Sequence, residues 1–220
     1  FIKGKQNTTE TGTTNTVMIG ESNTVKGLSR NNLIVGSLNE ISNSINNATV
    51  LGINGNARTE AEVLIGGGKG SLSDSTDAAT FISRRKTSVI ELAGVTIDNT
   101  ATDLTVQGGD GFINVEANSI IGFDIFITRL ELAGSSGTAG NYSYRNLRGV
   151  VTIDNSRTMT FVIGFTRNVS KVGVWGTCVM AESTVGSDLS ISVNVQDRNN
   201  VHNLWSASVT LHEVVSTTTF

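Results

Sequence analysis

The sequence predicts an all-β protein in which a short β-solenoid is followed by an antiparallel β-sandwich of jelly-roll type. An apolar phrase ending in glycine recurs near the N-terminus, β-rich runs separated by polar turns fill the remainder, and proline is absent from the 220 residues. Without proline, turns must come from Gly, Asn and Asp, which reach left-handed backbone angles. The expected domains are a repeat shaft at 1–70, a neck at 71–86 and a sandwich tip at 87–220.

The predicted shaft contains four copies of one phrase: NTVMIG, NNLIVG, NATVLG and AEVLIG. The copies close at Gly20, Gly36, Gly52 and Gly66. These glycines are sixteen, sixteen and fourteen residues apart, which is too short for the common helical repeats and too long for a heptad. A shorter apolar piece follows each phrase, so each repeat predicts one coil of a β-solenoid. We expect the glycines at tight corners, where a side chain would collide with the next coil.

Asparagines accompany the glycines. Asn23, Asn39 and Asn47 suit left-handed turn positions and can stack as hydrogen-bonded ladders. A flexible Gly/Asn-rich linker is the alternative, but a linker does not keep an apolar register. A single thin stack of coils leaves apolar residues on an outer wall, so three chains are expected to share that wall as a common core.

The predicted neck contains the basic run Arg84-Arg85-Lys86. Three adjacent cations suit an anion such as phosphate or sialic acid. A short charge run is more often a solvated surface. We therefore favour a solvated bend, or salt bridges between chains to Asp74 and Asp77.

The C-terminal module is a series of strands separated by Gly, Asn and Ser turns. In SIIGFDIFITRLEL the apolar residues Ile121, Phe123, Ile125 and Ile127 fall on one face of a strand. Further strands follow at a spacing of about ten residues, which predicts the sandwich.

The four repeats resemble the head repeats of trimeric autotransporter adhesins, where coils of the pattern S-V-A-I-G stack into a left-handed β-roll and three chains pack together. The same coil is found in phage fibres. Residues 119–215 resemble a small β-sandwich at the C-terminal tips of many phage tail fibres: SIIGFDIFITR opens it, YRNLRGVVTIDN follows, and a strand from Trp205 to Val214 closes it. The resemblance implies a homotrimeric tail or head fibre on a virion, whose tip faces a receptor or is structural.

Composition disfavours several other kinds of site. A net charge of −3 gives no indication of the basic surface that nucleic-acid binding requires. Two histidines, His202 and His212, make a His-rich metal site implausible. The single cysteine, Cys178, excludes an internal disulfide framework and is expected to be a small buried apolar residue. No apolar run is long enough to span a membrane.

We expect no catalytic residue, metal or cofactor. A glycosidase needs two carboxylates that face each other, and the sequence does not identify such a pair. Four coils are also too short for the long wall on which tailspikes usually place a sugar groove.

The best candidate for a receptor site lies in the expected loop 135–148 and consists of Tyr142, Tyr144, Arg145 and Arg148. Tyrosine faces can stack on sugar rings, and arginine can grip carboxylates with two hydrogen bonds. Alternatively, the tyrosines begin a strand and pack between chains.

Together these features predict a non-enzymatic trimeric virion fibre that attaches to a glycan or protein of the host-cell surface. Phe1-Ile2 reads like a cut from something longer, so contacts to other virion proteins are expected through an upstream segment. The alternatives are a bacterial trimeric surface adhesin head and a tailspike that depolymerises polysaccharide.

Overall fold

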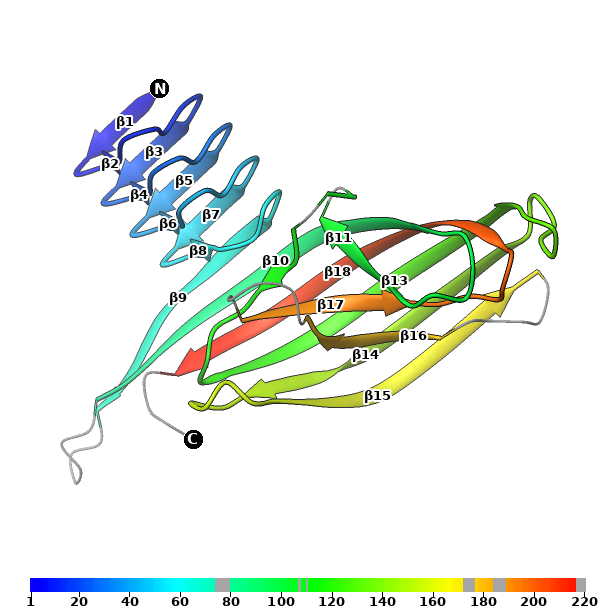
Figure 1. The fold of residues 1–220 in the computed structure, drawn as a ribbon. Coiled ribbons are helices and arrows are strands. Elements are labelled where there is room, and N and C mark those ends of the chain that lie inside the picture. The colour runs from blue at the N-terminus through cyan, green and yellow to red at the C-terminus, as the bar shows by residue number, and fades with distance from the viewer. Residues whose placement is uncertain (74–79, 107, 110, 172–176, 184–188, 217–220) are drawn as a thin grey trace.

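The computed structural model describes residues 1–73, 80–106, 108–109, 111–171, 177–183 and 189–216 (Figure 1). All regular elements in these residues are strands. The described residues contain no helix that is long and apolar enough to cross a membrane. The strands of the N-terminal part are β1 (Ile2–Lys5), β2 (Thr8–Thr9), β3 (Val17–Glu21), β4 (Thr24–Val25), β5 (Leu33–Ser37), β6 (Glu40–Ile41), β7 (Thr49–Ile53), β8 (Asn56–Ala57) and β9 (Val63–Ser73). Those of the C-terminal part are β10 (Thr80–Thr96), β11 (Thr102–Val106), β12 (Ile113–Asn114), β13 (Ser119–Ala133), β14 (Tyr142–Ile153), β15 (Met159–Ser170), β16 (Cys178–Glu182), β17 (Ser190–Val195) and β18 (His202–Ser216).

The N-terminal strands form a solenoid with two parallel walls. One wall is β1-β3-β5-β7-β9 and the other is β2-β4-β6-β8. Between them lies a narrow core whose largest fully buried side chains are Met18, Ile34, Ile41 and Leu64. The predicted all-β class and a solenoid of roughly four turns are therefore confirmed.

The repeated glycines lie inside the long strands of the coils rather than at the corners between them. Gly20 and Gly36 have φ of +132° and +140°, a backbone conformation that other residues rarely adopt. A Cβ on Gly36 would lie 1.8 Å from the carbonyl oxygen of Gly52 in the next coil. Gly66 has no left-handed φ, but a Cβ there would lie 2.5 Å from the Ile53 carbonyl oxygen. Close approach between coils thus excludes a side chain at these positions.

The asparagines form two ladders. In the buried ladder, the Asn39 amide donates to Asn23 Oδ1 at 3.2 Å and to the Gly52 carbonyl at 2.9 Å. In the exposed ladder, Asn31 donates to Asn47 at 3.3 Å. Asn47 takes the left-handed conformation, as expected, but Asn23 and Asn39 do not, because the residue before each of them makes the turn.

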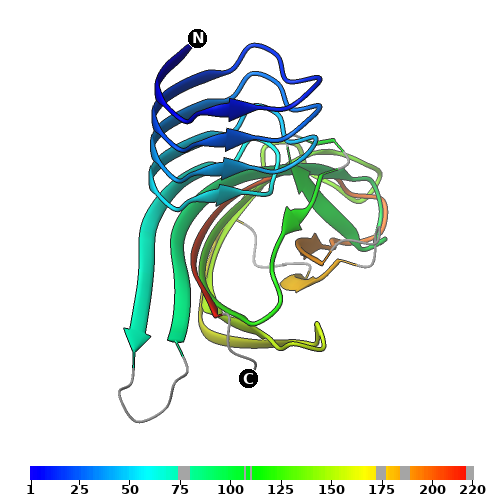
Figure 2. The same cartoon turned by 90° about the vertical axis from the view of Figure 1, so that its left-hand side faces the viewer.

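The shaft and the C-terminal part share one sheet. Strand β9 pairs parallel with β7 and antiparallel with β10, which in turn pairs with β18. Figure 2 shows these strands following one another as one curved wall. The expected neck, 71–86, therefore falls in β9 and β10, except for 74–79, which lies outside the described residues.

The C-terminal part consists of a large antiparallel sheet, β10-β18-β13-β14-β15, and a small one in which β17 pairs with β11, β12 and β16. The two sheets enclose one apolar core that includes the predicted face of Ile121, Phe123, Ile125 and Ile127. Because β11 pairs with both β10 and β17, the sheets are joined along one side (Figure 1).

Candidate functional site

The outer face of the large sheet carries most of the predicted receptor residues. Successive side chains of a strand point to opposite faces, and Tyr142, Tyr144 and Arg148 of β14 all point away from the core. Tyr142 and Arg148 are exposed, and Tyr144 is half-buried. The expectation of a loop over 135–148 is correct only up to Asn141, because β14 begins at Tyr142.

Tyr142 ends a row of apolar side chains that crosses four strands. Val95 lies opposite Leu204, Leu204 opposite Leu130, and Leu130 opposite Tyr142. All four are exposed, by 43–53%. They border a mostly apolar hollow of about 820 Å³, which is an unusual feature for a face that meets only water.

A second hollow, of about 480 Å³, lies beside the first and shares Tyr144 with it. The Tyr144 ring stands 6.0 Å from that of Phe126, and the Arg148 guanidinium lies 5.8 Å from the Phe165 ring centre. Arg148 also forms an ion pair with Asp124 at 2.8 Å. Aromatic faces beside a cation can bind a sugar, and they can equally pack against another protein surface.

Arg145 lies apart from the other three predicted residues, on the opposite face of β14. Its Nε donates to Asn168 at 2.7 Å, and its Nη1 donates to the Cys178 carbonyl at 3.0 Å. Cys178 is buried, as expected, and burial raises the pKa of its thiol to about 12. The structure therefore brings together three of the four predicted receptor residues.

The junction between shaft and tip holds a charged cluster that sequence reasoning missed. Arg58, which follows β8, forms ion pairs with Glu116 at 2.8 Å and with Glu213 of β18 at 2.6 Å. Arg84 of β10 also contacts Glu116, at 3.3 Å. Burial alone would lower the pKa of the Arg58 guanidinium, but the two carboxylates outweigh it and raise that pKa.

A second set of contacts completes this cluster. The Lys86 ammonium lies 3.0 Å from Glu62 and 3.3 Å from Glu213, and the Ser88 hydroxyl donates to Glu62. Burial alone would raise the pKa of both glutamates, but Lys86 and Arg58 outweigh it and hold both pKa values below their usual range. The three acids and three bases of the cluster are thus paired with one another.

The basic run 84–86 therefore lies only partly at the surface. Lys86 points into the cluster, and Arg84 pairs with Glu116, whereas Arg85 is exposed. The partners proposed for the run, Asp74 and Asp77, lie outside the described residues. A signal for the cluster did exist in the sequence: Glu62 is charged at a repeat position that is uncharged in the other coils.

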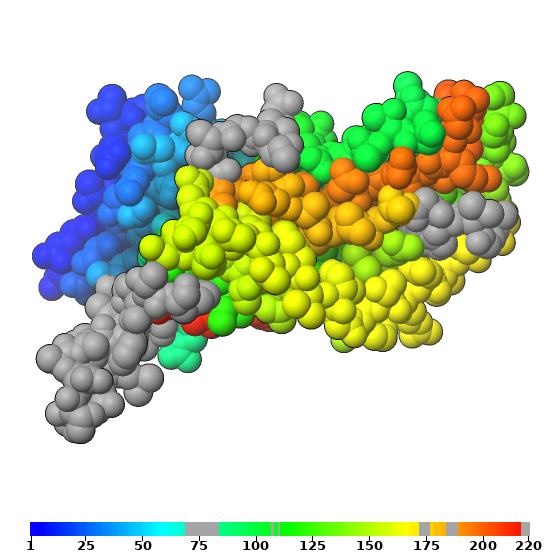
Figure 3. All heavy atoms as spheres, turned by 60° about the horizontal axis from the view of Figure 1, so that its bottom comes forward, coloured from blue at the N-terminus to red at the C-terminus, as the bar shows by residue number. Residues whose placement is uncertain are grey.

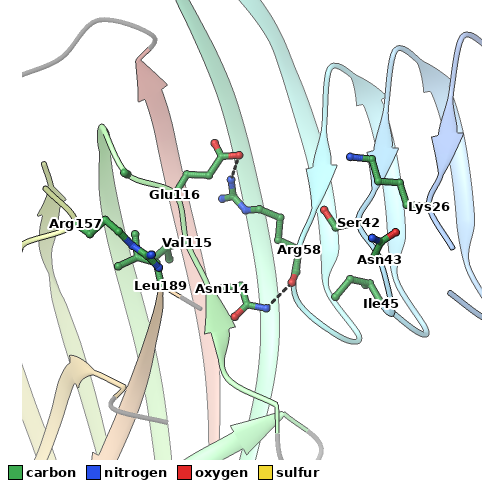
Figure 4. Close-up of a pocket in the computed structure, with 11 residues that line it drawn as sticks. Lys26, Ser42, Asn43, Ile45, Arg58, Asn114, Val115, Glu116, Arg157 and Leu189 are labelled. Atoms are coloured by element: carbon green, nitrogen blue, oxygen red, sulfur yellow. Dashed lines mark hydrogen bonds and ion pairs between the residues drawn. The ribbon is translucent and has the colours of Figure 1, made fainter. Parts of the chain in front are cut away.

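A polar groove of about 510 Å³ borders this cluster between the coils and the tip, and Arg58 and Glu116 belong to both (Figure 4). Its polar lining comprises Lys26, Ser42, Asn43, Arg58, Asn114, Glu116 and Arg157. The side-chain amide of Asn114 donates a hydrogen bond to the Arg58 carbonyl at 2.8 Å and so links the tip to the shaft within the groove. Hydroxyl, amide, guanidinium and carboxylate groups give the groove both donors and acceptors, which suits a hydroxyl-rich ligand.

Among the described residues, no three His, Cys, Asp or Glu side chains gather where they could hold a metal ion. The most deeply buried acidic and basic side chains instead form ion pairs with one another. At the far end of the tip, Arg129 contacts Asp197, and Arg198 lies 3.0 Å from Glu131.

Two solved structures show a distant likeness to this chain. The tailspike protein of Acinetobacter baumannii phage AM24 aligns with 91% of this chain at 9% identity and a TM-score of 0.27, and the tailspike protein of Acinetobacter phage vB_ApiP_P1 aligns with 92% at 7% identity and a TM-score of 0.30. The chain spans 44% and 47% of these two proteins. No family model matches the sequence, and no curated protein matches it. At such low identities and TM-scores the likeness carries no argument about function.

Proposed function

We propose that this chain is part of a non-enzymatic, homotrimeric attachment fibre on a phage virion. The observation that carries this proposal is the unbroken sheet that runs from the coils into the tip. Backbone pairing links β7, β9, β10 and β18 across the junction, with one irregularity between Arg84 and Lys86, and such pairing favours a rigid connection between shaft and tip. A stiff rod with a broad end is suited to holding a recognition surface away from a particle.

The buried glutamates of the junction are poorly suited to act as the proton donor of a glycosidase. A glycosidase needs a carboxylic acid whose pKa is raised so that it can donate a proton. The buried Glu62 and Glu213 instead have lowered pKa values because cations face them. We propose attachment rather than polysaccharide cleavage; a bacterial trimeric surface adhesin head and a polysaccharide-depolymerising tailspike are the alternatives.

Recognition of a host-cell glycan or protein has two candidate places. One is the outer face around Tyr142, Tyr144 and Arg148. The other is the polar groove at the junction, which Asn43 lines from the shaft and Arg157 lines from the tip (Figure 4).

The test begins with phage particles from the genome that encodes this chain. Immunogold labelling should mark fibre ends, and the purified chain should compete with these particles for host cells. Loss of competition in Asn43→Ala with Arg157→Ala would assign recognition to the groove, and loss in Tyr142→Ala with an intact oligomer would assign it to the outer face. Release of reducing sugar from the host polysaccharide would refute the proposal that the chain is not an enzyme. Absence of gold label from virions would refute the proposal that the chain belongs to a virion fibre.

A further inference from the structure

The shaft side of the polar groove is built from one column of residues. Lys26, Ser42 and Arg58 directly follow β4, β6 and β8, and these strands pair in register. All three residues line the groove. The column thus offers one side chain per coil, at the strand spacing of about 4.8 Å, so a ligand lying along the groove can contact several coils at once.

The tip supplies the other side of the groove. Asn114 lines it from β12, and Arg157 lines it from the turn between β14 and β15. Figure 3 shows this turn, in yellow-green, beside the blue coils. Arg157 is exposed and has a φ of +68°, in the left-handed region that favours Gly or Asn. Residues held in such uncommon backbone conformations are often found at binding sites.

The lining of the groove has a surplus of positive charge. Its described residues include three cations, Lys26, Arg58 and Arg157, and one carboxylate, Glu116. Both oxygens of Glu116 already face arginines, because Oε1 lies 2.8 Å from Arg58 and Oε2 lies 3.3 Å from Arg84. An anion that enters the groove is therefore attracted rather than repelled.

Two of these cations keep donors for a ligand. The terminal nitrogens of Arg58 contact glutamates, but its Nε is buried and has no hydrogen-bond partner within the described part of the chain. Such a buried donor is rare in native proteins, and an oxygen of a ligand would supply its acceptor. The Lys26 ammonium pairs with Glu40 at 2.9 Å, but this side chain is 39% exposed and an ammonium has three donors.

Neutral groups in the groove suit the remainder of a sugar. Ser42 and Asn43 from the shaft, and Asn114 from the tip, carry hydroxyl and amide groups that both donate and accept. Sugar hydroxyls need partners of both kinds. Ile45 and Val115 add apolar surface to the lining, which can pack against the C–H groups of a sugar ring.

We propose that this groove binds an acidic saccharide, whose carboxylate pairs with Arg157 and whose hydroxyls bond to Ser42 and Asn43. A planar guanidinium can hold a carboxylate with two hydrogen bonds. Because the ligand contacts both sides of the groove, it bridges shaft and tip. This inference rests on the proposed attachment function and adds the place of binding and the chemical class of the ligand.

The first test compares two forms of one probe, the purified surface polysaccharide of the host cell. One form is native, and in the other carbodiimide activation and borohydride reduction have converted the carboxyl groups to primary alcohols. In calorimetry the parent chain should bind the native form about tenfold more tightly, because the reduced form lacks the charged hydrogen-bond acceptor. Added salt should weaken binding of the native form more than binding of the reduced form. Equal affinity for both forms would overturn the acidic class.

The second test removes the contact from the tip side. Arg157→Gln should bind the native polysaccharide about tenfold more weakly than the parent does and should bind the reduced form as the parent does. The matched control is Arg85→Gln, because Arg85 is also an exposed arginine but lies outside the groove lining. An equal loss in Arg85→Gln would mean that the polysaccharide responds only to the overall charge of the chain, and this result would overturn the site.

The third test fills the groove from the shaft side. Asn43→Trp should block binding, whereas Thr11→Trp should not, because Thr11 is an exposed residue at the same position two coils farther from the tip. Unchanged melting temperatures show that both variants fold. Parent-like binding by both Arg157→Gln and Asn43→Trp, or a loss confined to Tyr142→Ala, would overturn the groove. A parent that binds no host polysaccharide but competes with phage for cells would overturn this inference and leave the proposed fibre intact.

Discussion

Replacing Lys86 by Met tests whether the charged cluster joins shaft and tip. Methionine keeps an unbranched apolar stem and removes the charge that lies 3.0 Å from Glu62 and 3.3 Å from Glu213. These two carboxylates have 1 and 2% of their side-chain surface exposed, so water cannot replace the cation. Removing one partner of a buried ion pair costs about 3–5 kcal/mol. Because Glu213 keeps Arg58 as a partner, we expect the lower end, about 3 kcal/mol.

The measurement is urea unfolding at pH 7 and at equal protomer concentration, since oligomer stability depends on concentration. Lys26→Met is the matched control: it removes an ion pair of 2.9 Å whose side chains are 39 and 34% exposed, and such surface pairs are worth about 0–1 kcal/mol. If Lys86→Met costs no more than Lys26→Met, the cluster does not stabilise the junction.

The same variant has a signature in pH. In the parent, the lowered pKa values of Glu62 and Glu213 contribute stability above their usual value of 4.5, and that contribution is lost as pH falls through the folded-state pKa values. In Lys86→Met, burial continues to raise both pKa values while one of the opposing cations is gone. The free-energy gap between parent and variant should therefore narrow from pH 7 to pH 5. A gap that does not change with pH would contradict this account.

Three further outcomes test the ladders and the thiol. Gly36→Ala should lower the melting temperature more than Gly68→Ala does. Both glycines have positive φ, but only at position 36 would the Cβ lie against another coil. Equal losses of melting temperature would mean that backbone strain alone, and not contact between coils, requires glycine at position 36. Asn39→Ala should cost about 2–4 kcal/mol in urea unfolding, because the buried amide makes contacts to both neighbouring coils, and a loss below about 1 kcal/mol would contradict the ladder's role. Cys178 should resist iodoacetamide at pH 8 until the chain unfolds, because burial raises its pKa to about 12, and fast labelling of the folded chain would show that the site is open.

The solenoid was predictable because its signal is local and repeated. Glycines at nearly equal spacing, each after an apolar run, predict stacked coils without any knowledge of long-range pairing. The position of Gly36 inside a strand was not predictable, because it depends on the register between coils, which places the Gly52 carbonyl where a Cβ would be. The ladder asparagines were identified, and Asn47 is left-handed as predicted, but the left-handed residues before Asn23 and Asn39 were not predicted.

The candidate site was only partly predictable. Strand alternation would have separated Arg145 from Tyr142, Tyr144 and Arg148, but the Gly/Ser-rich segment before them favoured a loop. The Arg58–Glu213 pair joins residues 155 positions apart, and no short-range pattern identifies such a partner. The tip illustrates the same limit, since β11 joins the two sheets through pairings that alternation alone does not specify.

The charged cluster also has a physical role in the register of the junction. Strand β9 runs parallel to its coil neighbour but antiparallel to β10, and the β9–β10 pairing is irregular between Arg84 and Lys86. A slip of one residue in β10 that put Thr87 in the place of Lys86 would move Lys86 to the outer face. It would leave Glu62 without its nearest cation and Glu213 with Arg58 alone. The slip would cost free energy by exposing apolar residues of β10. The larger cost would come from a carboxylate left buried without its cation. The junction therefore uses ionic contacts to select one register, while apolar packing supplies most of the attraction on either side of it.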